Sequence, residues 1–183
     1  MAKIEKNLQQ AILDLPQKEK DKLLIRLIGK DKLLIEKFEF ELLEAGETLQ
    51  ERRTDLHEAF EMMYHSYITS PKALLYEVRK MSSAITRHLK ITKDKYGEVE
   101  LTIALIKGCF EHNTYIVEKY SSYADALLQY LAKRTEAVVK KVEKLHPDEQ
   151  FDFLENLNLL LQYNYQYATA YYAKELKLPK KFD

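Results

Sequence analysis

The chain has 183 residues with 29 basic and 29 acidic side chains, so its formal net charge is zero and no global field attracts nucleic acid or an anionic membrane. Its composition, 46% hydrophobic and 32% charged, is typical of a folded protein and excludes a disordered chain. Cys109 is the only cysteine, which excludes an intramolecular disulfide and favours a reducing compartment.

The scarcity of turn residues indicates the fold class. Four glycines and four prolines interrupt long stretches of Leu, Lys, Glu, Gln and Ala, which lose little rotamer freedom in a helix. The sequence predicts an all-α protein with a single domain over residues 1–183. No apolar run approaches the ~18 residues of a membrane-spanning helix, and the first residues lack the apolar core of a secretory signal. We therefore expect a cytoplasmic protein without a membrane partner.

The motif KDKLLI occurs twice near the start of the chain, ten positions apart. Apolar residues at helical spacing predict a short helix over residues 3–13 and a second over 16–28. We expect Gly29 to end the second helix in the left-handed conformation and Asp31 to cap the next one. The repeated motif then marks the front ends of two successive helices that meet at a corner.

A sustained apolar pattern follows over residues 31–67. Apolar residues step by three or four, a spacing typical of a long helix packed lengthwise against others. Gly46 lies inside this stretch and weakens a helix by ~1 kcal/mol relative to Ala. We predict one long helix here, with a break near Gly46 as the alternative.

Four further helices are predicted downstream. Ser70 is a suitable cap and Pro71 a suitable first residue for a helix that ends near residue 90. The remaining pattern predicts a loop at 91–97 and helices at 98–112, at 114–145 with a possible break at Ser121 and Ser122, and at 148–177. About seven helices with short connections favour a compact, mostly antiparallel bundle, and a short α-solenoid is the alternative.

Charge is unevenly distributed along the chain. Residues 36–61 contain nine acidic and three basic side chains, whereas residues 72–95 contain seven basic and two acidic ones. Two consecutive segments of opposite charge can pair as an antiparallel hairpin. Exposed ion pairs contribute only ~0–1 kcal/mol each, so the pattern would guide pairing more than stabilise it.

The last predicted helix is rich in tyrosine and carries two apolar seams side by side. The second of these seams contains Leu160, Tyr163, Tyr167 and Tyr171. A helix packed against one core needs only one seam, so we predict that these four residues form an interface with another subunit or a protein partner. The alternatives are a central helix buried on both sides and a platform that stacks nucleic-acid bases.

The basic segment 72–95 is the candidate nucleic-acid site. Arg79, Arg87 and Lys90 lie within about one helical face, and two further lysines extend this face into the expected loop. Such a patch can contact phosphate groups, with a strong dependence on salt. The alternative is that these charges face the acidic segment or water, which the zero net charge favours.

Signals for a metal site are weak. His57, Glu61 and His65 stand four residues apart, but the two histidines are ~12 Å apart along a helix axis, too far for one zinc ion. Glu143 and His146 form one Glu-x-x-His pair, whereas a di-iron bundle needs two. We predict no metal site and no cofactor.

Signals for catalysis are equally weak. Cys109 lies on an apolar stripe, which favours a small buried residue over a nucleophile. The sequence contains no phosphate-binding loop, dinucleotide fingerprint or hydrolase elbow. We predict no catalytic residue.

The run LPQKEKDKLL at residues 15–24 resembles a family of uncharacterised bacterial all-helical proteins. The similarity includes Lys30 and Asp31 with ELLE at 41–44, and extends through KDKYGE at 93–98. This resemblance implies a bacterial, all-helical protein, and it transfers no functional residue.

Together these patterns predict a non-enzymatic helical protein-protein interaction or scaffold protein that forms homo-oligomers through its tyrosine-rich C-terminal helix. One alternative is a nucleic-acid-associated protein that uses segment 72–95. Others are an enzyme or metal protein without a recognisable motif, and a protein that binds a ligand in a bundle cavity.

Overall fold

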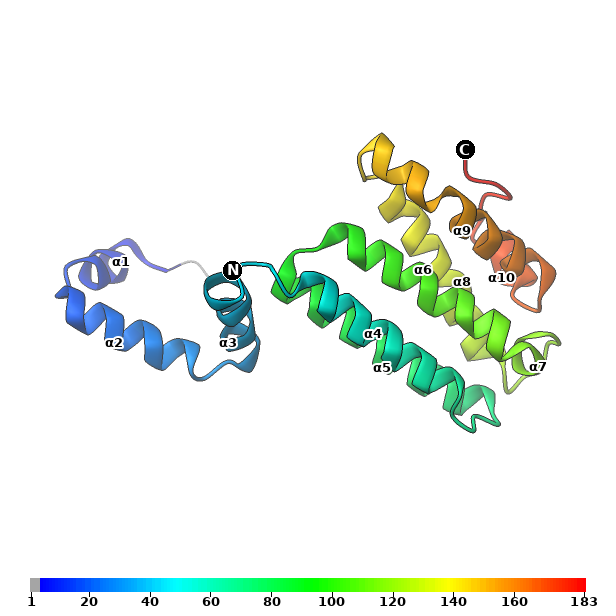
Figure 1. Ribbon diagram of the computed structural model, residues 1–183, viewed down its shortest axis with the longest axis horizontal. Helices are drawn as coiled ribbons and strands as arrows, with labels where there is room; N and C mark the ends of the chain where they lie inside the picture. The colour runs from blue at the N-terminus through cyan, green and yellow to red at the C-terminus, as the bar shows by residue number, and fades with distance from the viewer. Residues whose placement is uncertain (1–3) are drawn as a thin grey trace. The chain divides into compact units, whose positions relative to one another are not determined.

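Ten α-helices and one π-helix form the secondary structure of residues 4–183, the part of the chain that the computed structural model describes (Figure 1). The all-α prediction is confirmed. In chain order the helices are α1 (Lys6–Leu13), α2 (Gln17–Ile28), α3 (Lys32–Phe38), the π-helix η1 (Glu39–Leu43), α4 (Leu49–Tyr64), α5 (Pro71–Thr92), α6 (Lys95–His112), α7 (Thr114–Val117), α8 (Asp125–Val142), α9 (Pro147–Gln166) and α10 (Ala170–Glu175). None of these described helices is long and apolar enough to cross a bilayer.

The contacts divide the chain into two units, Met1–Gly46 and Glu47–Asp183, where the sequence predicted one domain. The boundary follows Ala45 and Gly46, whose φ angles are 49° and 82°. Positive φ values interrupt a right-handed helix, and glycine adopts them without steric cost. The prediction of one helix over 31–67 is wrong, and the alternative of a break near Gly46 is confirmed.

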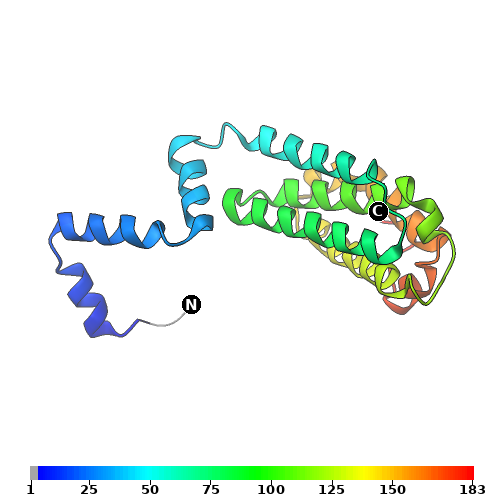
Figure 2. The ribbon, with the colours of Figure 1, turned by 90° about the horizontal axis from the view of Figure 1, so that it is seen from below.

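The first unit consists of α1, α2, α3 and η1; α2 contacts α3, which continues directly into η1 (Figure 2). Asp31 caps α3 as predicted, because its side chain accepts hydrogen bonds from the N–H groups of Leu33 and Leu34 at 2.9 and 3.3 Å. Gly29 keeps a right-handed conformation with a φ of −61°, so the predicted left-handed cap is wrong. The backbone instead turns tightly, with the Asp31 N–H donating to the Ile28 carbonyl at 3.0 Å.

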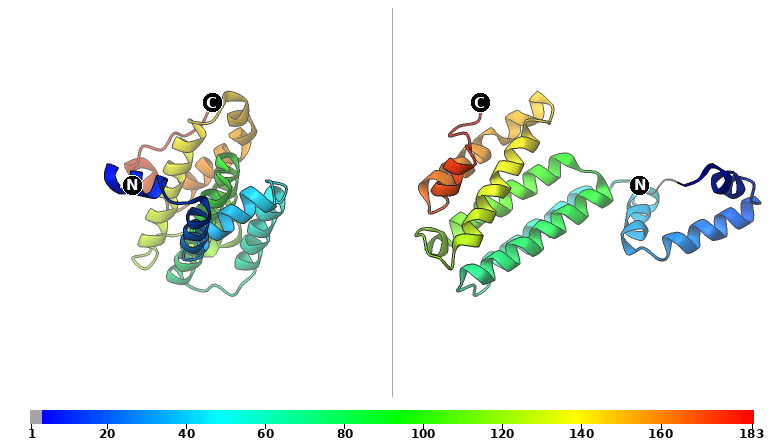
Figure 3. Two further views of the ribbon diagram at one scale, coloured as in Figure 1. Left: turned by 90° about the vertical axis from the view of Figure 1, so that its left-hand side faces the viewer. Right: turned by 180° about the vertical axis from the view of Figure 1, so that it is seen from behind.

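The second unit is a helical bundle built around α6. Helices α4, α5, α8 and α9 all pack against α6, and α7 follows it directly (Figure 3). Ten of the 18 residues of α6 are buried, which makes it the central helix of the unit. A helix that is apolar around most of its circumference belongs in an interior, and the run LTIALI at residues 101–106 has this character.

Helices α5 and α6 form a hairpin joined by two residues. The predicted loop at 91–97 is wrong, because α5 continues to Thr92 and α6 begins at residue 95. Lys93 turns the chain with a φ of 60°. Asp94 then caps α6, where its side chain accepts a hydrogen bond from the Gly97 N–H at 2.8 Å.

The remaining helix boundaries match the sequence more closely. Ser70 caps α5 as predicted, accepting a hydrogen bond from the Ala73 N–H at 3.2 Å. The possible break at Ser121 and Ser122 is confirmed, since both lie between α7 and α8. The helix predicted over 148–177 is wrong in its second half, where it divides into α9 and α10.

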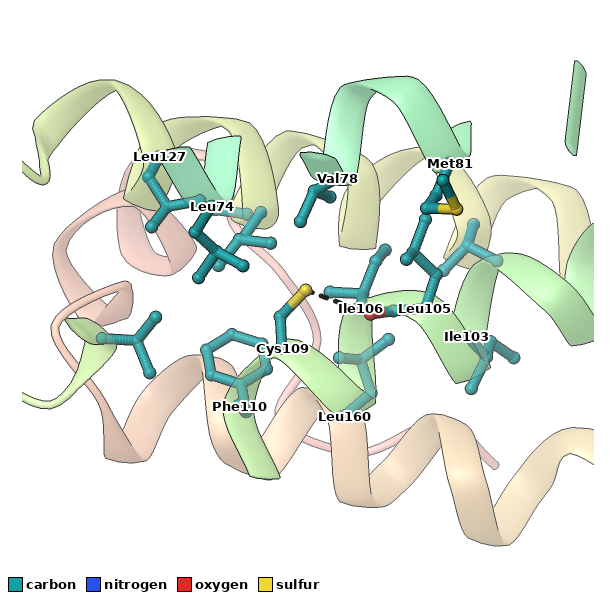
Figure 4. Close-up of a cluster of buried hydrophobic side chains, with 14 of the residues drawn as sticks. Leu74, Val78, Met81, Ile103, Leu105, Ile106, Cys109, Phe110, Leu127 and Leu160 are labelled. Atoms are coloured by element: carbon teal, nitrogen blue, oxygen red, sulfur yellow. Dashed lines mark hydrogen bonds between the residues drawn. The ribbon is translucent and has the colours of Figure 1, made fainter. Parts of the chain in front are cut away.

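The core of the second unit lies where α5, α6, α8 and α9 meet (Figure 4). Side chains from all four helices that are at most 1% exposed converge there: Leu74, Val78, Leu105, Leu127 and Leu160. Because each helix contributes large apolar side chains, this core holds α9 against α6 and α8.

Candidate interaction surfaces

Leu160 belongs to the core, although the sequence predicted it in an interface. Its side chain is fully buried, and α9 contacts α6, α8 and α10 of its own unit. Helix α9 carries two apolar seams because helices of its own unit cover it on more than one side. The interface role predicted for Leu160 is wrong.

Tyr163 and Tyr167 are half-buried against α6. The Tyr167 ring stacks on Phe110 with centroids 5.6 Å apart, and the Tyr163 ring tilts against Phe110 at 5.8 Å. The Tyr163 hydroxyl also donates a hydrogen bond to the Glu111 carboxylate at 3.1 Å. The structure thus brings both tyrosines into an intramolecular aromatic cluster, in which each remains only partly exposed.

Tyr171 is separated from the other two tyrosines by the end of α9. The backbone is extended at Tyr167, with a ψ of −177°, so Tyr171 lies on α10. It is 68% exposed, and its ring meets that of Tyr172 edge-on at a centroid distance of 5.2 Å. These two tyrosines line a cavity together with Tyr120 and Asp125.

The first unit carries much of the exposed apolar surface of the described chain. Phe40 is its only buried residue among residues 4–46. Nine of the 17 large hydrophobic side chains that are exposed lie in this unit, although it is only a quarter of the chain. We call these nine residues the N-terminal apolar surface: Ile4, Leu8, Ile12, Leu13, Leu24, Ile25, Leu27, Leu42 and Leu43.

The predicted phosphate contacts Arg79, Arg87 and Lys90 are all exposed on α5. The Arg79 guanidinium lies over the Tyr130 ring, 5.4 Å from its centroid. This contact orients Arg79 along the surface of α8, so Arg79 is partly engaged within the unit.

Lysines from distant parts of the sequence surround a cavity of about 390 Å³ beside the α5–α6 turn. Lys93 and Lys95 line it from the turn, and Lys141 and Lys144 line it from the end of α8. Glu98 also lines the cavity and forms an ion pair with Lys141. Sequence analysis found the first two lysines only, because the contribution of α8 depends on tertiary packing.

The three candidate metal ligands, on α4 and at its C-terminal end, do not converge. His57 lies 2.6 Å from a carboxylate oxygen of Glu100 on α6, measured from its Nε2 atom, whereas His65 pairs with Glu61 at 3.6 Å. Throughout residues 4–183, no group of three His, Cys, Asp or Glu side chains is placed to hold a metal ion. His146 caps α9 instead, with its Nδ1 accepting a hydrogen bond from the backbone at 3.4 Å.

Cys109 is fully buried in the core, as the sequence indicated. Its thiol donates a hydrogen bond to the Leu105 carbonyl at 3.2 Å (Figure 4). Burial raises the pKa of the Cys109 thiol, whereas a nucleophilic cysteine needs a lowered pKa.

A buried charged cluster, which the sequence did not reveal, joins α4, α5 and α6. Arg53 donates two hydrogen bonds of 2.7 Å to the Asp94 carboxylate, and His88 Nε2 lies 3.1 Å from the same group. The side chains of Asp94 and His88 are only 6% and 4% exposed. A His–Asp pair occurs in many active sites, but a pair this enclosed is not accessible to a substrate and instead fastens three helices together.

The surroundings of Asp94 determine its charge. Burial alone would raise the pKa of Asp94, but the hydrogen bonds from His88, Arg53 and the Gly97 N–H outweigh burial and hold that pKa well below its usual range. The carboxylate is therefore charged at neutral pH, as a bidentate partner of Arg53 must be.

The chain matches no protein-family model, no curated protein and no solved structure. Its function is therefore inferred from the surfaces described above.

Proposed function

We propose that the protein is a non-enzymatic helical interaction protein that self-associates through its N-terminal apolar surface. The observation that supports this proposal is the exposure of nine large apolar side chains in a unit whose described residues include a single buried one. Segments of this size rarely build a sufficient core alone, and large apolar side chains that remain exposed in such a segment are candidates for contact with a partner.

Charge complementarity favours a second copy of the chain as the partner. Residues 16–32, which include α2, contain six basic and three acidic side chains. Residues 36–61 contain nine acidic and three basic ones, and most of these acids are exposed. A second copy therefore offers both an apolar surface to cover and an acidic segment to face the basic side chains of α2.

Light scattering on the full-length protein over a range of concentrations tests this proposal. Leu24→Glu combined with Leu27→Glu places two charges in the surface, at side chains that are 55% and 52% exposed. We expect a wild-type dimer or larger oligomer and a largely monomeric double variant. The matched control is Phe151→Glu, because Phe151 is 74% exposed but lies in the second unit.

Two results would contradict self-association. The first is a wild-type protein that stays monomeric at ~100 μM, which corresponds to a binding free energy weaker than about −5.5 kcal/mol. The second is a monomer that sediments with anionic vesicles, which would identify the basic amphipathic helices as a membrane-surface element instead.

A second candidate function is supported by the lysine-lined cavity beside the α5–α6 turn. Lys141 and Lys144 add two positive charges from α8 to the two that Lys93 and Lys95 contribute from the basic segment, which favours binding of a polyanion such as nucleic acid. Nucleic-acid binding at low salt that is lost when Lys93 and Lys144 become Ala would support this function at the cavity. Loss of binding when Arg79, Arg87 and Lys90 become Ala would extend the site to the predicted contacts, and unchanged binding in both variants would exclude it.

A further inference from the structure

A cavity of about 460 Å³ lies between the start of α8 and α10, and its lining combines aromatic rings with one carboxylate. We propose that this cavity binds a small quaternary ammonium cation. The residues that line it are Tyr120, Asp125, Ala168, Tyr171 and Tyr172. None of them takes part in the N-terminal apolar surface, so the site is independent of the proposed self-association.

The carboxylate of Asp125 supplies the negative charge. The hydroxyl of Tyr120 donates a hydrogen bond to Asp125 Oδ1 at 3.3 Å, and the hydroxyl of Tyr172 donates to the same oxygen. These two bonds fix the carboxylate and the two phenol groups relative to each other before any ligand binds. A preformed site loses less conformational entropy on binding than a flexible one.

The proximity of the carboxylate also raises the pKa of two of the tyrosines. The hydrogen bond to Asp125 raises the pKa of Tyr172 to about 12, and the charge of Asp125 raises the pKa of Tyr120. The cavity therefore presents one carboxylate beside aromatic rings, of which Tyr120 and Tyr172 stay protonated at neutral pH, and this combination matches a ligand with a single positive charge.

The rings are arranged as walls of a cage. Tyr171 and Tyr172 meet at an interplanar angle of 84°, so their faces point in perpendicular directions. Tyr172 is only 7% exposed, whereas Tyr120 and Tyr171 are 63% and 68% exposed. One ring thus forms the inner wall, and two rings remain accessible from solvent.

This combination favours a methylated ammonium over a primary one. Aromatic faces attract cations through their quadrupole, and quaternary ammonium groups are recognised in cages of this kind. The hydroxyls of Tyr120 and Tyr172 already donate to Asp125, so the ring faces that remain suit N-methyl groups. The cavity volume also falls within the ~300–1,000 Å³ of small-molecule sites.

Titration of the full-length protein with choline, followed by calorimetry and by the NMR signals of the tyrosine rings, tests the proposal. The matched control ligand is 3,3-dimethylbutan-1-ol, which has the shape of choline without its charge. We expect choline and tetramethylammonium to bind and the alcohol to bind at least about tenfold more weakly, because it lacks the attraction to Asp125 and to the ring faces. A peptide that contains trimethyllysine is titrated in the same way. Comparison of its binding with that of choline distinguishes a methylated side chain from a free cation as the source of the ammonium group.

Variants locate the binding site. Tyr171→Ala should weaken choline binding by about 2- to 30-fold, the range of one cation–π contact, and Asp125→Asn should weaken it as well. Tyr123→Ala is the matched control, since Tyr123 is 88% exposed and does not line the cavity. Circular dichroism checks that each variant is folded.

Three outcomes would overturn the proposal: no saturable binding of any quaternary ammonium in the millimolar range, equal binding of choline and the neutral alcohol, or equal effects of Tyr171→Ala and Tyr123→Ala.

Discussion

Replacement of Asp94 by Asn tests the charged cluster that joins α4, α5 and α6. The Asp94 carboxylate receives two hydrogen bonds from Arg53 and one from the Gly97 N–H, and it lies 3.1 Å from His88. The substitution keeps the shape of the side chain but leaves the Arg53 guanidinium, whose side chain is 17% exposed, without its counter-ion. Breaking a buried ion pair from one side costs about 3–5 kcal/mol, a large part of the ~5–15 kcal/mol that stabilises a typical domain.

Urea and thermal unfolding measure this loss. All 13 tyrosines follow residue 63, so the tyrosine signal in near-UV circular dichroism reports on the second unit, whereas the first unit contributes phenylalanine signal only. At about 2–4 °C per kcal/mol for a domain of this size, Asp94→Asn should lower the Tm of that signal by about 6–20 °C. A double-mutant cycle with Arg53→Met isolates the pairwise contribution.

The pH dependence provides an independent measurement. Because the folded protein holds the pKa of Asp94 below its unfolded value of ~3.9, the carboxylate contributes fully above that pH and progressively less as the pH falls below it. The stability difference between wild type and Asp94→Asn should therefore shrink in acid. A loss below ~1 kcal/mol at neutral pH, as for an exposed ion pair, would refute a fastening role.

Three further substitutions or modifications test the core of the second unit. Gly108→Ala should lower the stability of the second unit strongly, because an added Cβ would lie 2.3 Å from the Tyr64 ring. Combining it with Tyr64→Leu should relieve part of that loss. If the losses of the two substitutions in urea unfolding are simply additive, the contact is contradicted. Leu160→Ala should lower the free energy of unfolding by about 2–5 kcal/mol in the same assay and leave the oligomeric state unchanged. If the variant keeps its stability but dissociates the oligomer, Leu160 belongs to an interface after all. Cys109 should react with a thiol reagent only as fast as the second unit opens, because it is buried with a raised pKa; rapid labelling of native protein would contradict this burial.

The sequence predicts local structure well where a single residue controls it. Asp31 and Ser70 cap their helices because each side chain satisfies nearby N–H groups, an interaction contained within four residues. The α5–α6 connection was predicted less well, because a lysine in the left-handed conformation is unusual and gives no sequence signal. The local cap that Asp94 provides for α6 ends the turn after two residues, and the contact of Asp94 with Arg53 on α4 adds to it.

The surfaces were harder to predict than the helices. Two apolar seams indicate that a helix is covered on two sides, but the sequence does not specify whether the cover comes from the same chain. The assignment of Leu160 to an interface failed for this reason. The cage around Asp125 combines residues from two distant segments of the chain, 120–125 and 168–172, and neither spacing nor composition predicts such a grouping.

The two-residue turn between α5 and α6 also affects the order of folding. Closing so short a connection costs little chain entropy, so this helical hairpin can form from local contacts alone. Helix α9 reaches α6 only after more than 30 intervening residues have been ordered. We therefore expect the α5–α6 hairpin to form early and to provide the template on which the later helices dock.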